Sequence, residues 1–213
     1  MNELTLPALV GLVGAVTFFL SPWVRRDPEA RAHLLKAGLL VGGVDLIVEL
    51  LGTYTGGWTY HHSALFVFKT VPVELPVLFT SSGVWLGAAH LAIRRLSGRA
   101  PSLDKVSLGV IIGSLGMYLA ALVLGQPLRM IVFTLPFGLW GYAKLPSDAQ
   151  RALALLLATA TAVADWVIER WAVGRGSYDY AEGFTVETPL TYALLTLGFL
   201  GILELGRRGS RDA

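Results

Sequence analysis

The sequence contains no cysteine, which excludes disulfides, thiolate metal sites and cysteine nucleophiles. Charged residues are also scarce: 15% of the 213 residues are Asp, Glu, Lys or Arg, whereas 54% are apolar. The mean hydropathy is +0.61. Such a composition excludes a soluble globular enzyme, and no basic cluster supports nucleic-acid binding. We therefore predict that most of the chain is solvated by lipid.

Long apolar stretches account for most of the sequence. A helix needs roughly 20 apolar residues to cross the hydrocarbon core. The stretches that meet or approach this length are residues 5–23, 33–52, 71–93, 105–125, 128–143, 150–172 and 185–206. The fifth is short and contains Pro136, which predicts a tilted or kinked helix. The sequence thus predicts an all-α integral membrane protein with seven transmembrane helices in a single domain, residues 1–213.

The basic residues are distributed unevenly between the predicted loops. Of the 17 Lys and Arg residues, 13 fall in the loops after the first, third and fifth spans and in the C-terminal tail. Basic loops stay in the cytoplasm. We therefore expect a multi-pass protein of the cell membrane, with its N-terminus outside and its C-terminus in the cytoplasm.

Two predicted helical hairpins carry the same ordered set of residues. The first contains Asp45, Glu49, Trp58-Thr59-Tyr60 and Val73-Glu74-Leu75-Pro76. The second contains Asp165, Glu169, Tyr178-Asp179-Tyr180 and Val186-Glu187-Thr188-Pro189. The matched order predicts two parallel three-helix repeats, at about residues 5–93 and 128–206, joined by a linking helix at about 105–125.

Six acidic residues recur in these hairpins. Each Asp-x3-Glu pair places two carboxyl groups on one helix face. An ionised Asp at the bilayer centre costs about 2.5–3.5 kcal/mol on insertion scales. We therefore expect the acids to face one shared interior cavity. They are Asp45, Glu49, Glu74, Asp165, Glu169 and Glu187.

Four aromatic residues in the outer loops are predicted to shape the mouth of that cavity. The alternative is an ordinary aromatic belt at the headgroup level. The four residues are Trp58, Tyr60, Tyr178 and Tyr180.

The run from Glu49 to Tyr60, followed by Val71 to Pro76, resembles the integral-membrane carotenoid-biosynthesis superfamily, as does the stretch from Asp165 to Tyr178. That superfamily contains carotenoid hydratases acting on bisanhydrobacterioruberin-type ends and, more distantly, membrane lycopene cyclases. The resemblance implies an enzyme that protonates the terminal double bond of a lipophilic polyene or isoprenoid, without a metal or cofactor. It implies Glu74 and Glu187 as the principal acid and base, with the other four acids lining the cavity.

The second acid of the cyclase motif is replaced by Leu75 in the first copy and by Thr188 in the second. Hydration and cyclisation of the substrate both remain open.

Two other hypotheses are kept. The Asp-x3-Glu pairs are also suited to hold Mg²⁺ against a diphosphate, as in a membrane prenyltransferase, although the acids are predicted near the outer face. A non-catalytic carrier or lipophilic-ligand-binding protein is the third class, because acids between repeated helices also mark ion and proton pathways. His61 and His62 are interpreted as a solvated pair in preference to a metal site.

Overall fold

The computed structural model describes residues 4–61, 63, 65–96, 129–180 and 186–208. The chain forms two compact units. Unit 1 comprises Met1–Ala89 and Glu169–Phe184, and unit 2 comprises His90–Ile168 and Thr185–Ala213.

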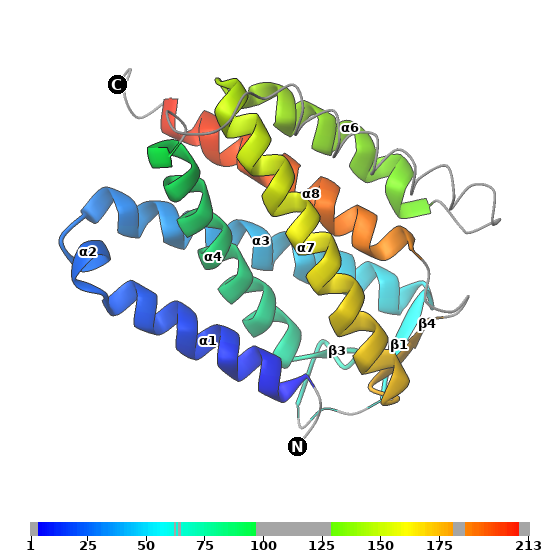
Figure 1. Ribbon diagram of the computed structural model, residues 1–213. Helices are drawn as coiled ribbons and strands as arrows, with labels where there is room; N and C mark the ends of the chain where they lie inside the picture. The colour runs from blue at the N-terminus through cyan, green and yellow to red at the C-terminus, as the bar shows by residue number, and fades with distance from the viewer. Residues whose placement is uncertain (1–3, 62, 64, 97–128, 181–185, 209–213) are drawn as a thin grey trace. The chain divides into compact units, whose positions relative to one another are not determined.

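Unit 1 is built on helices from the first part of the chain (Figure 1). They are α1 (Thr5–Leu20), the short α2 (Pro22–Arg25), α3 (Pro28–Tyr54) and the larger part of α4 (Glu74–Leu96). α3 begins at a well-formed cap, because the Asp27 carboxylate accepts a hydrogen bond from the Ala30 amide at 2.9 Å and Pro28 occupies the first turn. This cap fixes where the chain turns from α2 into α3.

Unit 2 contains the end of α4, α6 (Arg129–Lys144), most of α7 (Asp148–Gly174) and α8 (Glu187–Arg208). Ser147 caps the start of α7, because its hydroxyl oxygen accepts a hydrogen bond from the Gln150 amide at 3.2 Å. α6 continues through Pro136. Short polar turns thus define the helix starts that the sequence places only approximately.

The loops after α3 and α7 contain strand pairs that were not predicted from the sequence. β1 (Trp58–Tyr60) pairs antiparallel with β4 (Tyr178–Tyr180), and β2 (Phe66–Val67) pairs antiparallel with β3 (Val71–Pro72). β1 and β4 are the two aromatic-x-Tyr segments of the matched hairpins, and aromatic side chains favour strands. Two loops far apart in the sequence are therefore held together by backbone hydrogen bonds.

Glycines allow close helix packing in both units. A Cβ on Gly42 of α3 would lie 2.1 Å from Thr80 Oγ1 of α4, and a Cβ on Gly83 would lie 2.5 Å from the Ala37 carbonyl oxygen. In unit 2, a Cβ on Gly141 of α6 would lie 2.2 Å from the Leu197 carbonyl oxygen of α8. Small residues at crossings are typical of membrane helices, where close van der Waals packing holds the pairs together.

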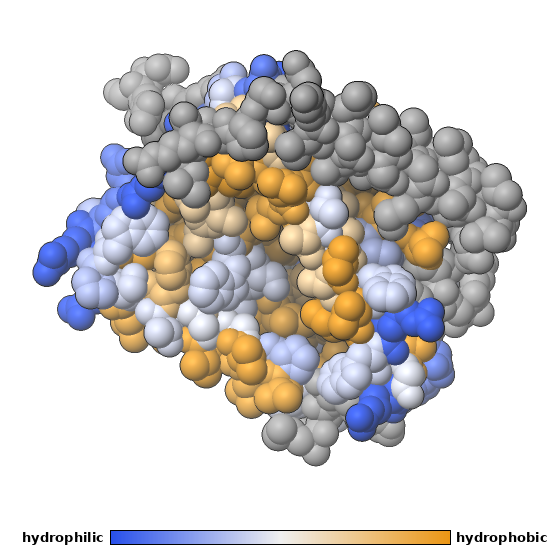
Figure 2. All heavy atoms as spheres, viewed as in Figure 1, coloured by the Kyte–Doolittle hydropathy of each residue, from blue (hydrophilic) through white to orange (hydrophobic). Residues whose placement is uncertain are grey.

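Three described helices have the length and composition to cross a membrane: Glu74–Arg95, Asp148–Gly174 and Glu187–Leu205. Figure 2 shows apolar side chains broadly exposed on the viewed face, as expected where the solvent is lipid. The chain is a multi-pass membrane protein.

Six of the predicted spans fall on helices of the structure. The linking helix expected at 105–125 lies outside the described residues. The count of seven helices and the two repeats therefore stay predictions.

Replacing Gly141 by Ala tests the α6–α8 contact. The added methyl group meets backbone atoms, which cannot rotate away, so we expect the free energy of unfolding in detergent to fall by about 1–3 kcal/mol. Gly43→Ala is the matched control, because a Cβ there meets no atom within 4 Å. It should leave stability unchanged or raise it by about 0.5–1 kcal/mol. Equal effects of the two substitutions would contradict close packing at Gly141.

Candidate functional site

Glu49 is the centre of a polar cluster at the end of α3. Its side chain is buried, and its Oε2 accepts hydrogen bonds from Trp58 Nε1 at 2.8 Å and from the Tyr60 hydroxyl at 2.7 Å. Gly52, one turn later, makes room for the Trp58 ring, since a Cβ there would lie 2.0 Å from Trp58 Cζ2. The carboxylate therefore ties the end of α3 to β1.

The second hairpin carries a corresponding contact. The Tyr178 hydroxyl donates a hydrogen bond to Oε2 of Glu169, the half-buried acid near the end of α7. The rings of Tyr60 and Tyr178 lie 5.2 Å apart between centroids. Three of the four predicted aromatic residues, Trp58, Tyr60 and Tyr178, thus cluster around the two glutamates. Tyr180 lies on β4, opposite Trp58 in the strand register.

Asp45 lies one turn before Glu49 on the same face of α3. It is 8% exposed, and its Oδ2 atom has no hydrogen-bond partner within the described residues. Its carboxyl group also lies close to that of Glu49. Among the four predicted acids of unit 1, Asp45 is therefore the one with a buried oxygen that has no partner within the described residues.

Glu74 and Glu187, the predicted principal acids, connect helix starts. Glu74 Oε2 accepts from the Ser63 hydroxyl at 2.8 Å, and its Oε1 accepts from the Thr5 hydroxyl at 3.4 Å, at the first residue of α1. Glu187 Oε1 accepts from the Ile131 amide at 3.0 Å, in the first turn of α6. The first amides of a helix have no partner within the helix, so Glu187 satisfies one of these donors.

The six predicted acids are divided between the two units. Asp45, Glu49, Glu74 and Glu169 belong to unit 1, and Asp165 and Glu187 belong to unit 2. Asp165 is half-buried on α7. A cavity shared by all six stays a prediction.

Within the described part of the chain, no group of three or more His, Cys, Asp or Glu side chains is placed to hold a metal ion. His61 pairs instead with Asp179 across the β1–β4 strands, at 2.9 Å between Nε2 and Oδ2. His62 lies outside the described residues. The arrangement in unit 1 thus anchors loops to helices and leaves Asp45 Oδ2 without a hydrogen-bond partner among the described residues.

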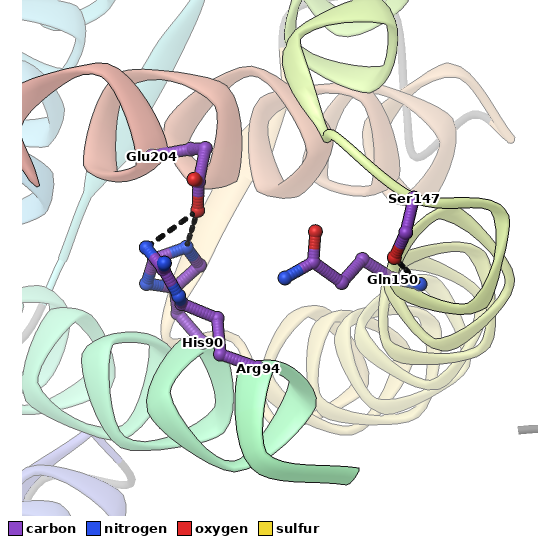
Figure 3. A network of polar contacts seen from close by, with 5 residues as sticks. All are labelled: His90, Arg94, Ser147, Gln150 and Glu204. Atoms are coloured by element: carbon purple, nitrogen blue, oxygen red, sulfur yellow. Dashed lines mark hydrogen bonds and ion pairs between the residues drawn. The ribbon is translucent and has the colours of Figure 1, made fainter. Parts of the chain in front are cut away.

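Unit 2 contains a buried polar cluster that the sequence analysis missed (Figure 3). Glu204 Oε2 on α8 contacts His90 Nε2 at 3.2 Å and Arg94 Nη1 at 3.0 Å, both on α4. Gln150 of α7 extends its amide toward this group, and its buried Oε1 has no hydrogen-bond partner within the described residues. The available signal was a lone acid and a lone histidine inside apolar runs, which mark interior-facing positions.

A shallow, open groove with a volume of about 630 Å³ lies along an exposed face of α7, and its described lining comes from this one helix. Its described lining is almost entirely apolar, and the one hydroxyl in it, on Thr159, donates to the Leu155 carbonyl oxygen at 2.9 Å. The lining residues are Leu156, Thr159, Ala160, Val163, Ala164, Val167 and Ile168.

No family model and no curated protein matches the sequence. Solved structures that are similar include the crystal structure of a mycobacterial Insig homolog, MvINS, from Mycobacterium vanbaalenii. Its sequence is 21% identical to this chain. The match covers 83% of this chain and 96% of that chain, with a TM-score of 0.49. A structure of a cross-linked MvINS trimer has the same identity and coverage, with a TM-score of 0.47.

These findings correct the resemblance drawn from the loop motifs. The similar structures are of an Insig homolog, not of a carotenoid hydratase or a lycopene cyclase, so the assignment to the carotenoid-biosynthesis superfamily is wrong. The enzyme prediction, an acid-catalysed hydratase or cyclase, is wrong for the same reason. The motifs misled because short aromatic-x-Tyr and Val-Glu-x-Pro patterns also occur where side chains connect helix ends to loops, as Glu49 and Glu74 do here.

Removing the Glu204 charge tests the cluster in unit 2. Glu204→Gln leaves the Arg94 charge without its carboxylate partner, so we expect the free energy of unfolding to fall by about 3–5 kcal/mol. Asp148→Asn makes the same chemical change in the exposed pair with Arg151, and should cost at most about 1 kcal/mol. Thermal or chemical unfolding in detergent measures both. A Glu204 variant as stable as the Asp148 variant would show that the buried pair adds nothing.

Proposed function

We propose that this chain is a non-catalytic membrane protein that binds a lipophilic molecule. The observation that carries the proposal is the apolar groove along α7. The contacts of the predicted acids support a protein without catalytic activity. Glu49, Glu74 and Glu187 each accept hydrogen bonds that hold helices or loops in place.

The lining of the groove indicates the chemistry of the ligand. The Thr159 hydroxyl is already bonded to its own helix, as it would be on any lipid-facing surface. Ala160 and Ala164 leave space in the middle of the groove, and the larger Leu156 and Val167 side chains flank them along α7. A linear or isoprenoid hydrocarbon chain can pack against such an apolar surface, whereas a polar molecule would find no hydrogen-bond partner among the described lining residues.

The proposal includes the two three-helix repeats. Its first support is that α3 and α7 end in the same way. Gly56 and Gly176 follow the two helices with φ of +74° and +71°. The next amides, of Gly57 and Ser177, donate to carbonyl oxygens five residues back, which is the Schellman pattern.

A second support for the repeats comes from side-chain contacts. Glu49 accepts from Trp58, and Glu169 accepts from Tyr178 at the corresponding positions. The register of β1 and β4 relates the two segments by a local two-fold, since Trp58 lies opposite Tyr180 and Tyr60 lies opposite Tyr178. With a linking helix between the repeats, the count would be seven. The charge distribution supports a cytoplasmic C-terminus.

Filling the groove tests the proposed function. The protein is placed in nanodiscs and labelled with a photoreactive palmitic acid, and labelled peptides are mapped by mass spectrometry. Ala160→Trp puts an indole into the groove, so we expect labelling of residues 156–168 to fall about tenfold, a loss of about 1.4 kcal/mol in binding.

Val10→Trp is the matched control, since Val10 is also an exposed apolar residue but lies on α1 outside the groove. It should leave labelling of α7 unchanged. Labelling that is spread evenly over all exposed helices and does not saturate would contradict a specific site. Conversion of a polyene by the purified protein would contradict the non-catalytic part.

A further inference from the structure

We propose that the turn of the β2–β3 hairpin, Phe68-Lys69, binds phospholipid at the membrane surface. The Phe68 ring packs against acyl chains, and the Lys69 ammonium group contacts a lipid phosphate. The hairpin lies between α3 and α4 in unit 1. The groove of the proposed function is formed by α7 in unit 2 and shares no residue with this hairpin.

The turn is built from residues that do not favour its backbone conformation. The Thr70 amide donates to the Val67 carbonyl oxygen at 3.3 Å, which closes a turn with Phe68 and Lys69 at its two central positions. Their φ angles are +49° and +71°. Hairpin turns with positive φ at both positions mostly contain Asn-Gly or similar pairs, because larger side chains are strained there. Residues kept in a strained conformation are often functional.

The side chains at the tip of the hairpin are exposed. Phe68 is 70% exposed, and Leu65, just before β2, is 61% exposed. Lys69 is also exposed, and among the described residues it has no ion-pair partner. By contrast, Val71 and Pro72 on the paired strand are buried. The hairpin therefore has one strand inside the protein and presents an aromatic ring and a positive charge outside it.

Hydrogen bonds hold the hairpin beside the ends of two helices. The Val73 amide donates to the Leu65 carbonyl oxygen at 3.0 Å, one residue before the candidate membrane span Glu74–Arg95 begins. At the turn, Thr53 Oγ1 in the last turn of α3 donates to Thr70 Oγ1 at 3.1 Å. β3 leads directly into α4 (Figure 1). The hairpin thus lies alongside the helix ends and does not extend away from them.

The packing of β3 limits how far the tip can be from the lipid. Val71 is fully buried in a cluster with Leu75 of α4, and Leu46 and Leu50 of α3 pack against this cluster. An extended chain covers at most about 3.6 Å per residue, so Phe68 lies within about 11 Å of Val71. The headgroup zone is about 5–8 Å deep on each side of the hydrocarbon core. The turn therefore stays within reach of the headgroups.

Phospholipid matches the chemistry of the tip better than a protein partner does. Aromatic rings are favoured at the boundary between headgroups and acyl chains, and a lysine there extends its ammonium group to the headgroup region. A stable protein interface buries about 800 Å² on each partner, which is more than the side chains of Leu65, Phe68 and Lys69 can supply together. Lipid needs no such area, because it already surrounds the helix ends.

The lack of cysteine in the natural sequence permits a direct test. Phe68→Cys creates a single site for a nitroxide spin label, and the full chain is placed in phosphatidylcholine nanodiscs. Electron paramagnetic resonance then compares the collisions of the label with oxygen, which concentrates in lipid, and with a water-soluble nickel chelate. We expect the oxygen-to-nickel ratio to be several-fold higher than for Thr59→Cys, the matched control, which is exposed on β1 opposite Asp179.

The contact between Lys69 and phosphate is tested in the same labelled protein. Lys69→Glu should repel the phosphate and shift the label toward water, so the oxygen-to-nickel ratio falls several-fold. Lys69→Arg keeps the charge and should leave the ratio unchanged. An unchanged ratio in Lys69→Glu would overturn the phosphate contact.

A stability measurement separates lipid binding from a role in the fold. Replacing Phe68 by Asn and Lys69 by Gly supplies the pair that this turn prefers, so the melting temperature in detergent should stay the same or rise. A clear fall would show that the two side chains serve the fold, and would overturn the proposal. Equal oxygen-to-nickel ratios at positions 68 and 59 would also overturn it. Labelling of the α7 groove by palmitic acid is measured separately, so either proposal can fail alone.

Discussion

A carboxyl group inside an apolar helix has no water to bond to, so every lone pair must find a donor within the protein or bear the cost of desolvation. This constraint accounts for much of the structure. Glu49 accepts hydrogen bonds from the Trp58 indole and the Tyr60 hydroxyl, and Glu187 accepts one from an amide in the first turn of α6. Glu204 contacts the His90 imidazole and the Arg94 guanidinium. Each contact joins parts of the chain that the sequence separates. The acids thus provide polar contacts between helices and loops that otherwise pack through apolar surface.

The packing of helices against one another follows from residue size. Glycines at Gly42, Gly83 and Gly141 bring backbones close where α3 meets α4 and where α6 meets α8. In lipid, helix pairs gain little from hiding apolar surface, so close contact and satisfied polar groups must hold them. The outward faces remain apolar, and the α7 groove is part of such a face.

Helix positions could be predicted from the sequence because hydropathy reports the local solvent directly. The Asp-x3-Glu spacing also correctly indicated that Asp45 and Glu49 share a face, and both are buried. The strand pair β1–β4 could not be foreseen, since pairing depends on the meeting of two distant loops. His90, Gln150 and Glu204 were missed because each is a single polar residue without a motif. The resemblance to carotenoid-biosynthesis enzymes was wrong because residues that connect helices to loops can have the same sequence pattern as catalytic residues.

The antiparallel pairing of Trp58–Tyr60 with Tyr178–Tyr180 has a consequence for biogenesis. More than a hundred residues separate the two strands, so a ribosome releases the first long before the second exists. Until then the backbone amides and carbonyls of the early strand lack their partner, and such an edge invites pairing with other chains. The nascent protein must therefore keep the loop that contains β1 from aggregating until α7 and the loop that contains β4 have been made.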